Sequence, residues 1–193
     1  MRHRTKGRIL GRNPNHQRAL LRNLVISLVM TERAHVMSER QLELDENKPK
    51  YPGRIITTLE KAKEVRPLVE KCVTLARKAQ KHLRDAAEFG TSAERGSSQW
   101  KQWRQSEQWA KWNQAMGPAL ALRRRAIKLI GDRTAVRILF EVLGPRFEDR
   151  QGGYTRILKL AKPRLGDAGR RAILEFVGKH DRVRAKAEKP VVE

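Results

Sequence analysis

Hydrophobic residues first recur at helical spacing directly after a helix start signal at residues 13 and 14. Asn13 offers a side-chain oxygen to the free backbone N–H groups of a first turn, and the fixed φ of Pro14 suits that turn. Arg18 and Arg22 lie four residues apart, on a different face from the apolar positions. The sequence therefore predicts a helix with one basic face and one apolar face, the latter made by Leu20, Leu21, Leu24, Val25, Leu28 and Val29.

A second set of patterns predicts a short strand and a long helix. Residues 55–58 are β-branched and favour a strand, and one of the threonines in that run is expected to cap the helix that follows. Pro67 is expected to kink or break this helix because it removes a backbone donor. The helix is expected to end near Gly90. Its apolar stripe consists of Ala62, Val65, Val69, Cys72, Ala76 and Ala79.

The last third of the chain predicts a capped helix followed by a hairpin. Asp132 has the position of a helix cap, and Gly144 with Pro145 is expected to close that helix. Residues 154–160 and 172–177 favour two strands joined by a glycine-containing turn. Together these patterns predict an α+β fold. It has a small mixed sheet, made of one short strand plus a C-terminal antiparallel hairpin, that about four helices cover.

The length of 193 residues and the hydrophobic fraction of 39% fit a single domain, which we place at residues 1–178. Within it we expect a basic extended arm over 1–12 and two insertions of low hydrophobicity, at 33–53 and 79–117. The charges of the first insertion nearly balance, which argues against phosphate binding there. Residues 179–193 are expected to form a charged mobile tail.

The second insertion contains all four tryptophans of the chain, among Gln, Lys and Arg residues. At about 100° per residue on a straight helix, Trp100 and Trp103 project roughly opposite to Trp109 and Trp112, which does not fit a simple core stripe. Three interpretations stay open. The rings stack on unpaired RNA bases, they contact neighbouring proteins in an assembly, or a broken helix folds two Trp pairs back on its own domain.

Charge indicates the class of partner. The chain has 43 Lys and Arg residues against 21 Asp and Glu residues, which gives a formal net charge of +22. Such an excess is typical of proteins that release counterions from nucleic acid phosphates or that adhere to anionic membranes. A membrane-surface protein carries an apolar helix face rimmed by Lys and Arg, whereas the densest charge here lies in the N-terminal arm. We therefore predict nucleic acid as the partner, and no membrane.

Residues suited to catalysis or metal binding are sparse. The five His residues are scattered, no pair of Cys exists, and no phosphate-cradling glycine loop is present. We predict that the chain is not an enzyme and has no small-molecule substrate, no metal and no cofactor. The single Cys72 cannot form an internal disulfide, so it is expected to be a small core residue in a reducing compartment.

Three separated blocks resemble one known family. They read MRHRTKGRILGRNPNHQRALLRNLVISLV at 1–29, RIITTLEKAKEVR at 54–66 and LGPRFEDRQGGYTRILK at 143–159. In this order they resemble ribosomal protein seventeen of the bacterial large subunit. The resemblance implies a cytoplasmic structural constituent of that subunit, present in one copy per ribosome. It also implies contact with large-subunit (23S) rRNA near the peptide exit tunnel and with neighbouring ribosomal proteins, and no catalysis.

The resemblance also implies which residues bind RNA. In the basic N-terminal block, the residues implied to contact rRNA are Arg2, His3, Arg4, Lys6, Arg8, Arg12, Asn13, His16, Arg18 and Arg22. The block near the end of the chain adds Arg146, Arg150, Tyr154 and Arg156. For Arg146 and Tyr154 a second interpretation stays open, in which they fix the turn between helix and hairpin.

The chain departs from the family pattern in the two insertions and the tail, which leaves open whether Trp100, Trp103, Trp109 and Trp112 contact RNA or protein. Without the resemblance, charge alone does not separate a ribosomal protein from a free RNA chaperone or a nucleoid-type protein. A free RNA chaperone or a nucleoid-type nucleic-acid-binding protein is therefore the alternative function.

Overall fold

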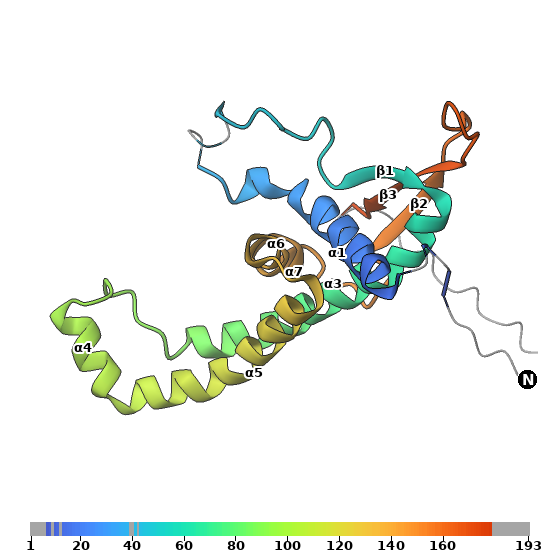
Figure 1. The fold of residues 1–193 in the computed structure, drawn as a ribbon. Helices are drawn as coiled ribbons and strands as arrows, with labels where there is room; N and C mark the ends of the chain where they lie inside the picture. The colour runs from blue at the N-terminus through green and yellow to red at the C-terminus, as the bar shows by residue number, and fades with distance from the viewer. Residues whose placement is uncertain (1–6, 9, 12, 39–40, 42, 179–193) are drawn as a thin grey trace, which may run out of the picture.

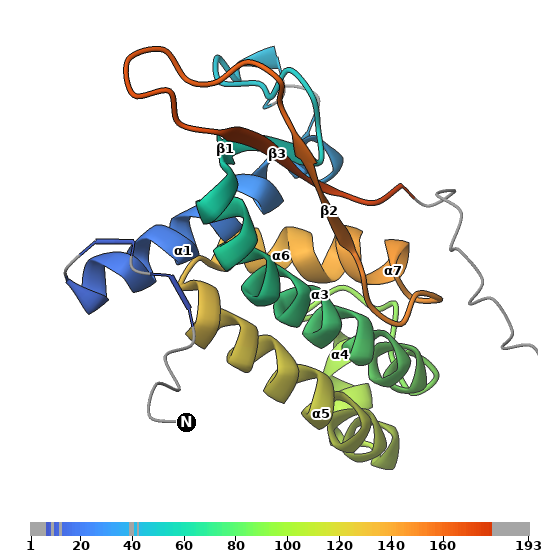
Figure 2. The same cartoon turned by 90° about the vertical axis from the view of Figure 1, so that its right-hand side faces the viewer.

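The computed structural model describes residues 7–178 of the chain apart from 9, 12, 39, 40 and 42. A small sheet lies at one end of a group of helices, and the longest helix, α3 (Leu59–Ala87), contacts all three strands. Figures 1 and 2 show the sheet packed over α3 and α6, and a helical projection made by the end of α3, α4 and the start of α5 that points away from it. The expected α+β fold is confirmed.

The sheet has the strand order β1-β3-β2, with β1 at Arg54–Thr58, β2 at Thr155–Lys159 and β3 at Arg171–Phe176. Leu174 of the central strand is the register partner of Ile55 on one side and of Ile157 on the other. Both described pairings are antiparallel, so the expectation of a mixed sheet is wrong. The reason is that β3 lies between β1 and β2, which run in the same direction but never pair.

The first helix, α1 (Pro14–Met30), begins where the sequence predicts. The side chain of Asn13 accepts a hydrogen bond from the backbone N–H of Asn15 at 2.8 Å, and Pro14 occupies the first turn. Val25, Leu28 and Val29 of the predicted apolar face are fully buried. The short 3₁₀ turn η1 (Arg33–His35) follows.

Helix α3 passes through the centre of the core. Its six predicted stripe residues are all buried, with an exposed fraction of at most 1% each. The helix continues without a break across the exposed Pro67, so the expected break does not occur. Val65 and Val69 on either side are buried in the same core, and this burial offsets the roughly 3 kcal/mol that an interior proline costs. Burial also raises the pKa of the Cys72 thiol to about 12.

The helix that Asp132 caps is longer than expected. The side chain of Asp132 accepts from the backbone N–H of Ala135 at 2.6 Å, as predicted, at the start of α6 (Arg133–Ile138). The chain then continues through a π-helical turn, η2 (Leu139–Leu143), into α7 (Gly144–Arg146), so Gly144 and Pro145 do not end it. Buried Gln80 of α3 donates to the carbonyl of Phe140 at 3.0 Å, which supplies a partner within the wider turn.

Beyond the end of α3, the projection consists of two helices. The short helix α4 (Ser98–Gln105) ends at Ser106, and α5 (Glu107–Ile130) starts immediately afterwards and runs through Gly117 and Pro118 back to the body. No helix among the described residues is long and apolar enough to cross a membrane.

Candidate nucleic-acid interface

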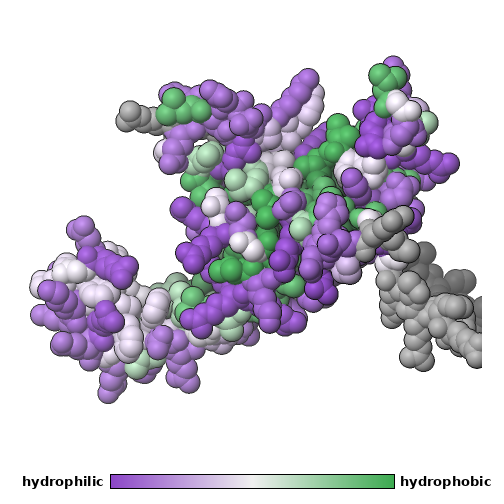
Figure 3. Space-filling model, viewed as in Figure 1, coloured by the Kyte–Doolittle hydropathy of each residue, from purple (hydrophilic) through white to green (hydrophobic). Residues whose placement is uncertain are grey.

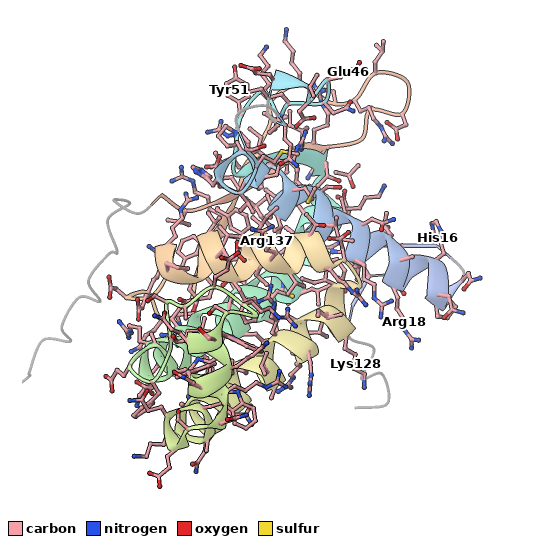
Figure 4. The ribbon with its side chains drawn as sticks, turned by 90° about the vertical axis from the view of Figure 1, so that its left-hand side faces the viewer. His16, Arg18, Glu46, Tyr51, Lys128 and Arg137 are labelled. Carbon is pink, nitrogen blue, oxygen red and sulfur yellow. The ribbon has the colours of Figure 1, made fainter. Side chains whose placement is uncertain are left out.

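The first turns of α1 present basic side chains to solvent. His16, Arg18 and Arg22 are exposed, and the first turn contains no acidic residue. Figure 4 shows His16 and Arg18 projecting from the N-terminal end of α1. Backbone N–H groups and the positive end of the helix dipole lie at the same end, which favours an anionic ligand such as a phosphate.

The described part of the N-terminal arm is tied to two helices. The backbone N–H of Arg8 donates to Glu64 Oε2 on α3 at 3.2 Å, and Gln17 of α1 donates to the carbonyl of Arg8. The residue Arg8 remains exposed. The bonds fix the backbone at the point where the arm meets the body, and leave the guanidinium of Arg8 available for a ligand.

Five of the predicted RNA-binding residues lie outside the described residues. The predictions for Arg2, His3, Arg4, Lys6 and Arg12 therefore stay predictions.

The end of α5 adds basic residues that the sequence analysis did not assign to the site. Arg124 and Lys128 are exposed and share a helix face because they are four residues apart. Helix α5 contacts α1, and in Figure 4 the labelled Arg18 and Lys128 lie in the same part of the view, below Glu46 and Tyr51 of the 33–53 segment, which lie at the top. We call His16, Arg18, Arg22, Arg124 and Lys128 the α1–α5 basic surface. The sequence signal that could have added Arg124 and Lys128 to the site is the basic run at 123–128, in which these two residues are four apart.

The α1–α5 basic surface carries charge that the protein does not neutralise. Among the described residues, no carboxylate forms an ion pair with any of its members. Exposed cations gathered without acidic partners raise the local potential and attract phosphates.

The second predicted block is different, because its side chains are bound within the protein. Arg146 donates to Glu32 Oε1 at 2.9 Å, and Glu32 has only 3% of its side chain exposed. Arg146 also donates to the carbonyl of Val177 at 3.4 Å. This favours the interpretation in which Arg146 fixes the junction between helix and hairpin, and it argues against Arg146 as a phosphate ligand.

Tyr154 is a core residue. Only 1% of it is exposed, and its ring packs against Phe147 with 5.2 Å between the centroids. Glu70 of α3 accepts hydrogen bonds from the backbone N–H groups of Tyr154 and Thr155, at 3.1 and 2.9 Å, and from the Thr155 hydroxyl. This burial favours the second interpretation for Tyr154, in which it fixes the turn between helix and hairpin, because a ring closed off from solvent cannot stack on a base.

Arg150 braces the turn before β2. Its Nε donates to the carbonyls of Gly152 and Gly153, at 3.2 and 3.1 Å. The two glycines have φ values of 112° and 62°, which a side chain would strain. Arg150 thus stabilises a backbone shape, and RNA contact is not needed to explain its position.

Arg156 is the member of this block that reaches the surface. It forms an ion pair with Glu175 of β3, which Arg54 of β1 also approaches at 3.4 Å. Half of the Arg156 side chain is exposed, against 4% of Glu175. The two arginines come from the strands on either side of β3, and both compensate its one buried carboxylate.

No group of three or more metal-binding side chains gathers anywhere in the described part of the chain.

Comparison with known proteins identifies the family of the chain. The family model described as Ribosomal protein L17 matches residues 50–177. A relative from Rhodopirellula baltica, named large ribosomal subunit protein bL17, is 60% identical over 193 residues, which cover 100% of this chain and 89% of that protein. Proteins of the same name from Syntrophotalea carbinolica and Bradyrhizobium diazoefficiens are each 33% identical, over 100% of this chain and 86% and 96% of their own length.

These matches include the segments that we expect to be insertions, since the first relative aligns with the whole chain. They also agree with the prediction that the chain is not an enzyme, because the matching family is one of structural proteins. On the extent of the family match and the full-length identity, the chain belongs to the ribosomal protein L17 family of the bacterial large subunit.

Proposed function

We propose that the chain is a structural constituent of the large ribosomal subunit in the bacterial cytoplasm, where it binds and bridges segments of 23S rRNA. The observation that carries this proposal is the α1–α5 basic surface, in which exposed cations of two helices lie together with no acidic partner among the described residues. One copy per ribosome, neighbouring ribosomal proteins as further partners, and a place near the peptide exit tunnel belong to the same proposal.

Binding depends on phosphates more than on bases. A-form RNA hides its base edges in a deep, narrow groove, so exposed arginines contact phosphate oxygens with their guanidinium forks. The arm and the α1–α5 basic surface meet at Arg8, whose backbone is fixed to α1 and α3. An arm held at that point can contact one rRNA segment while the helices contact another, which is how a single chain bridges two segments.

The test is the salt dependence of binding to a 23S rRNA fragment. Each neutralised phosphate releases counterions and contributes roughly −0.7 to −0.9 to the slope of log K against log salt. The double variant Arg18→Ala and Arg22→Ala should reduce the magnitude of that slope by roughly 1.4 to 1.8, and the thermal stability should stay unchanged because both side chains are exposed. An unchanged slope would remove α1 from the interface.

The matched control is Lys101→Ala with Lys111→Ala. It removes the same charge from exposed positions in the projection, far from α1 in Figure 1. The slope should then stay close to that of the unaltered chain.

In cells, a tagged chain should stay with large subunits after a high-salt wash, in nearly equimolar amount. Complete release into the soluble pool would favour a free RNA chaperone instead.

A further inference from the structure

All four tryptophans of the chain line one pocket, of about 410 Å³, in the angle between α4 and α5. The remaining lining comes from Arg104 and from four residues of the segment after α3, which are Gly90, Thr91, Ala93 and Arg95. The volume falls within the range of roughly 300–1,000 Å³ that is common for small-ligand sites. Helix α4, which carries part of the lining, lies at the far end of the projection, away from the sheet (Figure 1).

The break between the two helices creates this pocket. The backbone N–H and the hydroxyl of Ser106 both bond to the carbonyl of Trp103, at 3.0 and 2.7 Å, and end α4 there. The turn brings Trp103 against Trp112, with 5.6 Å between the ring centroids and an angle of 72° between the planes. The helix is therefore broken, as the third interpretation requires, but the pair that forms joins one ring from each helix.

The walls of the pocket are held before any ligand binds. The indole N–H of Trp103 donates to the carbonyl of Phe89 at 3.1 Å, which ties α4 to the end of the long helix α3. The hydroxyl of Ser97 accepts from the backbone N–H of Trp100 and caps α4. A site whose rings are positioned in advance loses little conformational entropy on binding.

The chemistry of the lining favours a planar anion-bearing ligand. The guanidinium of Arg104 lies 5.2 Å from the centre of the Trp100 ring, and Arg95 also lines the pocket. No Asp or Glu residue lines it, and neither arginine has an ion-pair partner among the described residues. A cationic ligand, such as a methylated lysine, would meet two like charges there.

The surface around the pocket does not resemble a hydrophobic protein interface. Figure 3 shows the projection mostly in purple and white, while green gathers over the helices and sheet of the body. Indole rings next to guanidinium groups on a hydrophilic surface are typical of sites that stack unpaired bases and hold the adjacent phosphates.

We propose that the pocket binds one unpaired base of a single-stranded RNA segment, stacked on the indole rings, with Arg95 and Arg104 facing the flanking phosphates. That the RNA is ribosomal rests on the function proposed above. This site is separate from the α1–α5 basic surface, so the two surfaces contact different parts of the RNA.

Tryptophan emission tests this directly, because every tryptophan of the chain lies in the pocket. Titration of the full chain with the single-stranded trinucleotide AAA should quench the emission, and a short RNA duplex should not. Trp109→Ala should weaken trinucleotide binding about tenfold or more, and Trp109→Phe should recover most of the loss. Trp109 is the variant of choice because Trp103 and Trp112 support each other.

A second pair of variants guards against misfolding. Arg104→Ala should weaken trinucleotide binding several-fold, whereas Lys101→Ala, on the same helix but outside the pocket lining, should leave it unchanged. Emission that does not respond to the trinucleotide overturns the proposal, as do equal effects of Arg104→Ala and Lys101→Ala. Quenching by an acidic peptide such as hexaglutamate, but not by RNA, also overturns it, in favour of a protein partner.

The two proposals fail separately. If emission stays constant while Arg18→Ala with Arg22→Ala reduces the salt slope of binding to the 23S rRNA fragment, the pocket proposal fails and the rRNA-binding function stands. If the trinucleotide quenches the emission while Arg18→Ala with Arg22→Ala leaves the salt slope unchanged, the pocket proposal stands and the role of α1 fails.

Discussion

The two arginine-rich regions of this protein resemble each other in sequence and differ in structure. Arg18 and Arg22 of α1 are exposed and have no acidic partner among the described residues. Arg146 and Arg156 pair with carboxylates that are 3% and 4% exposed. Buried acidic residues therefore decide whether an arginine serves the fold or a ligand.

The largest effect should come from breaking the most buried of these pairs. Arg146→Ala removes the arginine that pairs with the carboxylate of Glu32 and leaves that carboxylate buried, with His35 Nε2 at 3.3 Å as its remaining ion-pair neighbour among the described residues. An uncompensated buried charge costs about 3 kcal/mol, which should lower the melting temperature by roughly 6–12 °C. Calorimetry of the free protein checks this.

The double variant Arg146→Met with Glu32→Gln is the control, because it removes both charges and should recover most of the lost stability. If Arg146→Ala kept full stability but weakened RNA binding as much as Arg18→Ala with Arg22→Ala, the contrast between the two regions would be wrong.

Part of this contrast could be predicted from the sequence and part could not. The cap at Asn13, the stripe of α3 and the hairpin follow from neighbouring residues, and the structure confirms them. The Glu32 to Arg146 pair joins positions 114 residues apart, and no local pattern encodes it. The same holds for the hydrogen bonds that Glu70 accepts from the backbone of Tyr154 and Thr155, so the sequence left both interpretations of Tyr154 open.

Local geometry also explains what the sequence did reveal about the tryptophans. A straight helix puts the two Trp pairs on opposite faces, and this pattern did not fit a simple core stripe. Ser106 ends the first helix, so rings that the sequence separates come to line a single pocket. The pattern showed that a break was one of three options, but not which rings would meet.

A smaller effect should follow from removing the acceptor that orders the start of β2. Glu70→Ala leaves the backbone N–H groups of Tyr154 and Thr155 without the carboxylate that accepts from both. Buried donors without partners cost about 1–3 kcal/mol, so we expect a loss of about 2 kcal/mol in urea unfolding. Glu70→Gln keeps one acceptor oxygen and should lose less. Stability equal to that of the unaltered chain would mean that Tyr154 is held by ring packing alone.

The smallest change in stability is expected at an exposed ion pair. Such a pair shows what ion pairing contributes to stability when neither side chain is buried. Arg164 and Asp167 form an ion pair in the loop between β2 and β3, and about half of each side chain is exposed. The Arg164 guanidinium lowers the pKa of Asp167 below its ordinary value of 3.8. The stability that the pair contributes is therefore present above that ordinary pKa and is lost as the pH falls through the lower, folded-state pKa.

Because water and salt screen an exposed pair, Asp167→Asn should change the melting temperature only slightly at about pH 7, and less still at about pH 2. Melting curves at both pH values and two salt concentrations measure the difference. A decrease at pH 7 as large as that of Arg146→Ala would contradict the argument, because pairing would then stabilise this fold regardless of burial. A small difference that salt removes would mean that burial is what converts an arginine from a ligand-binding residue into a structural one.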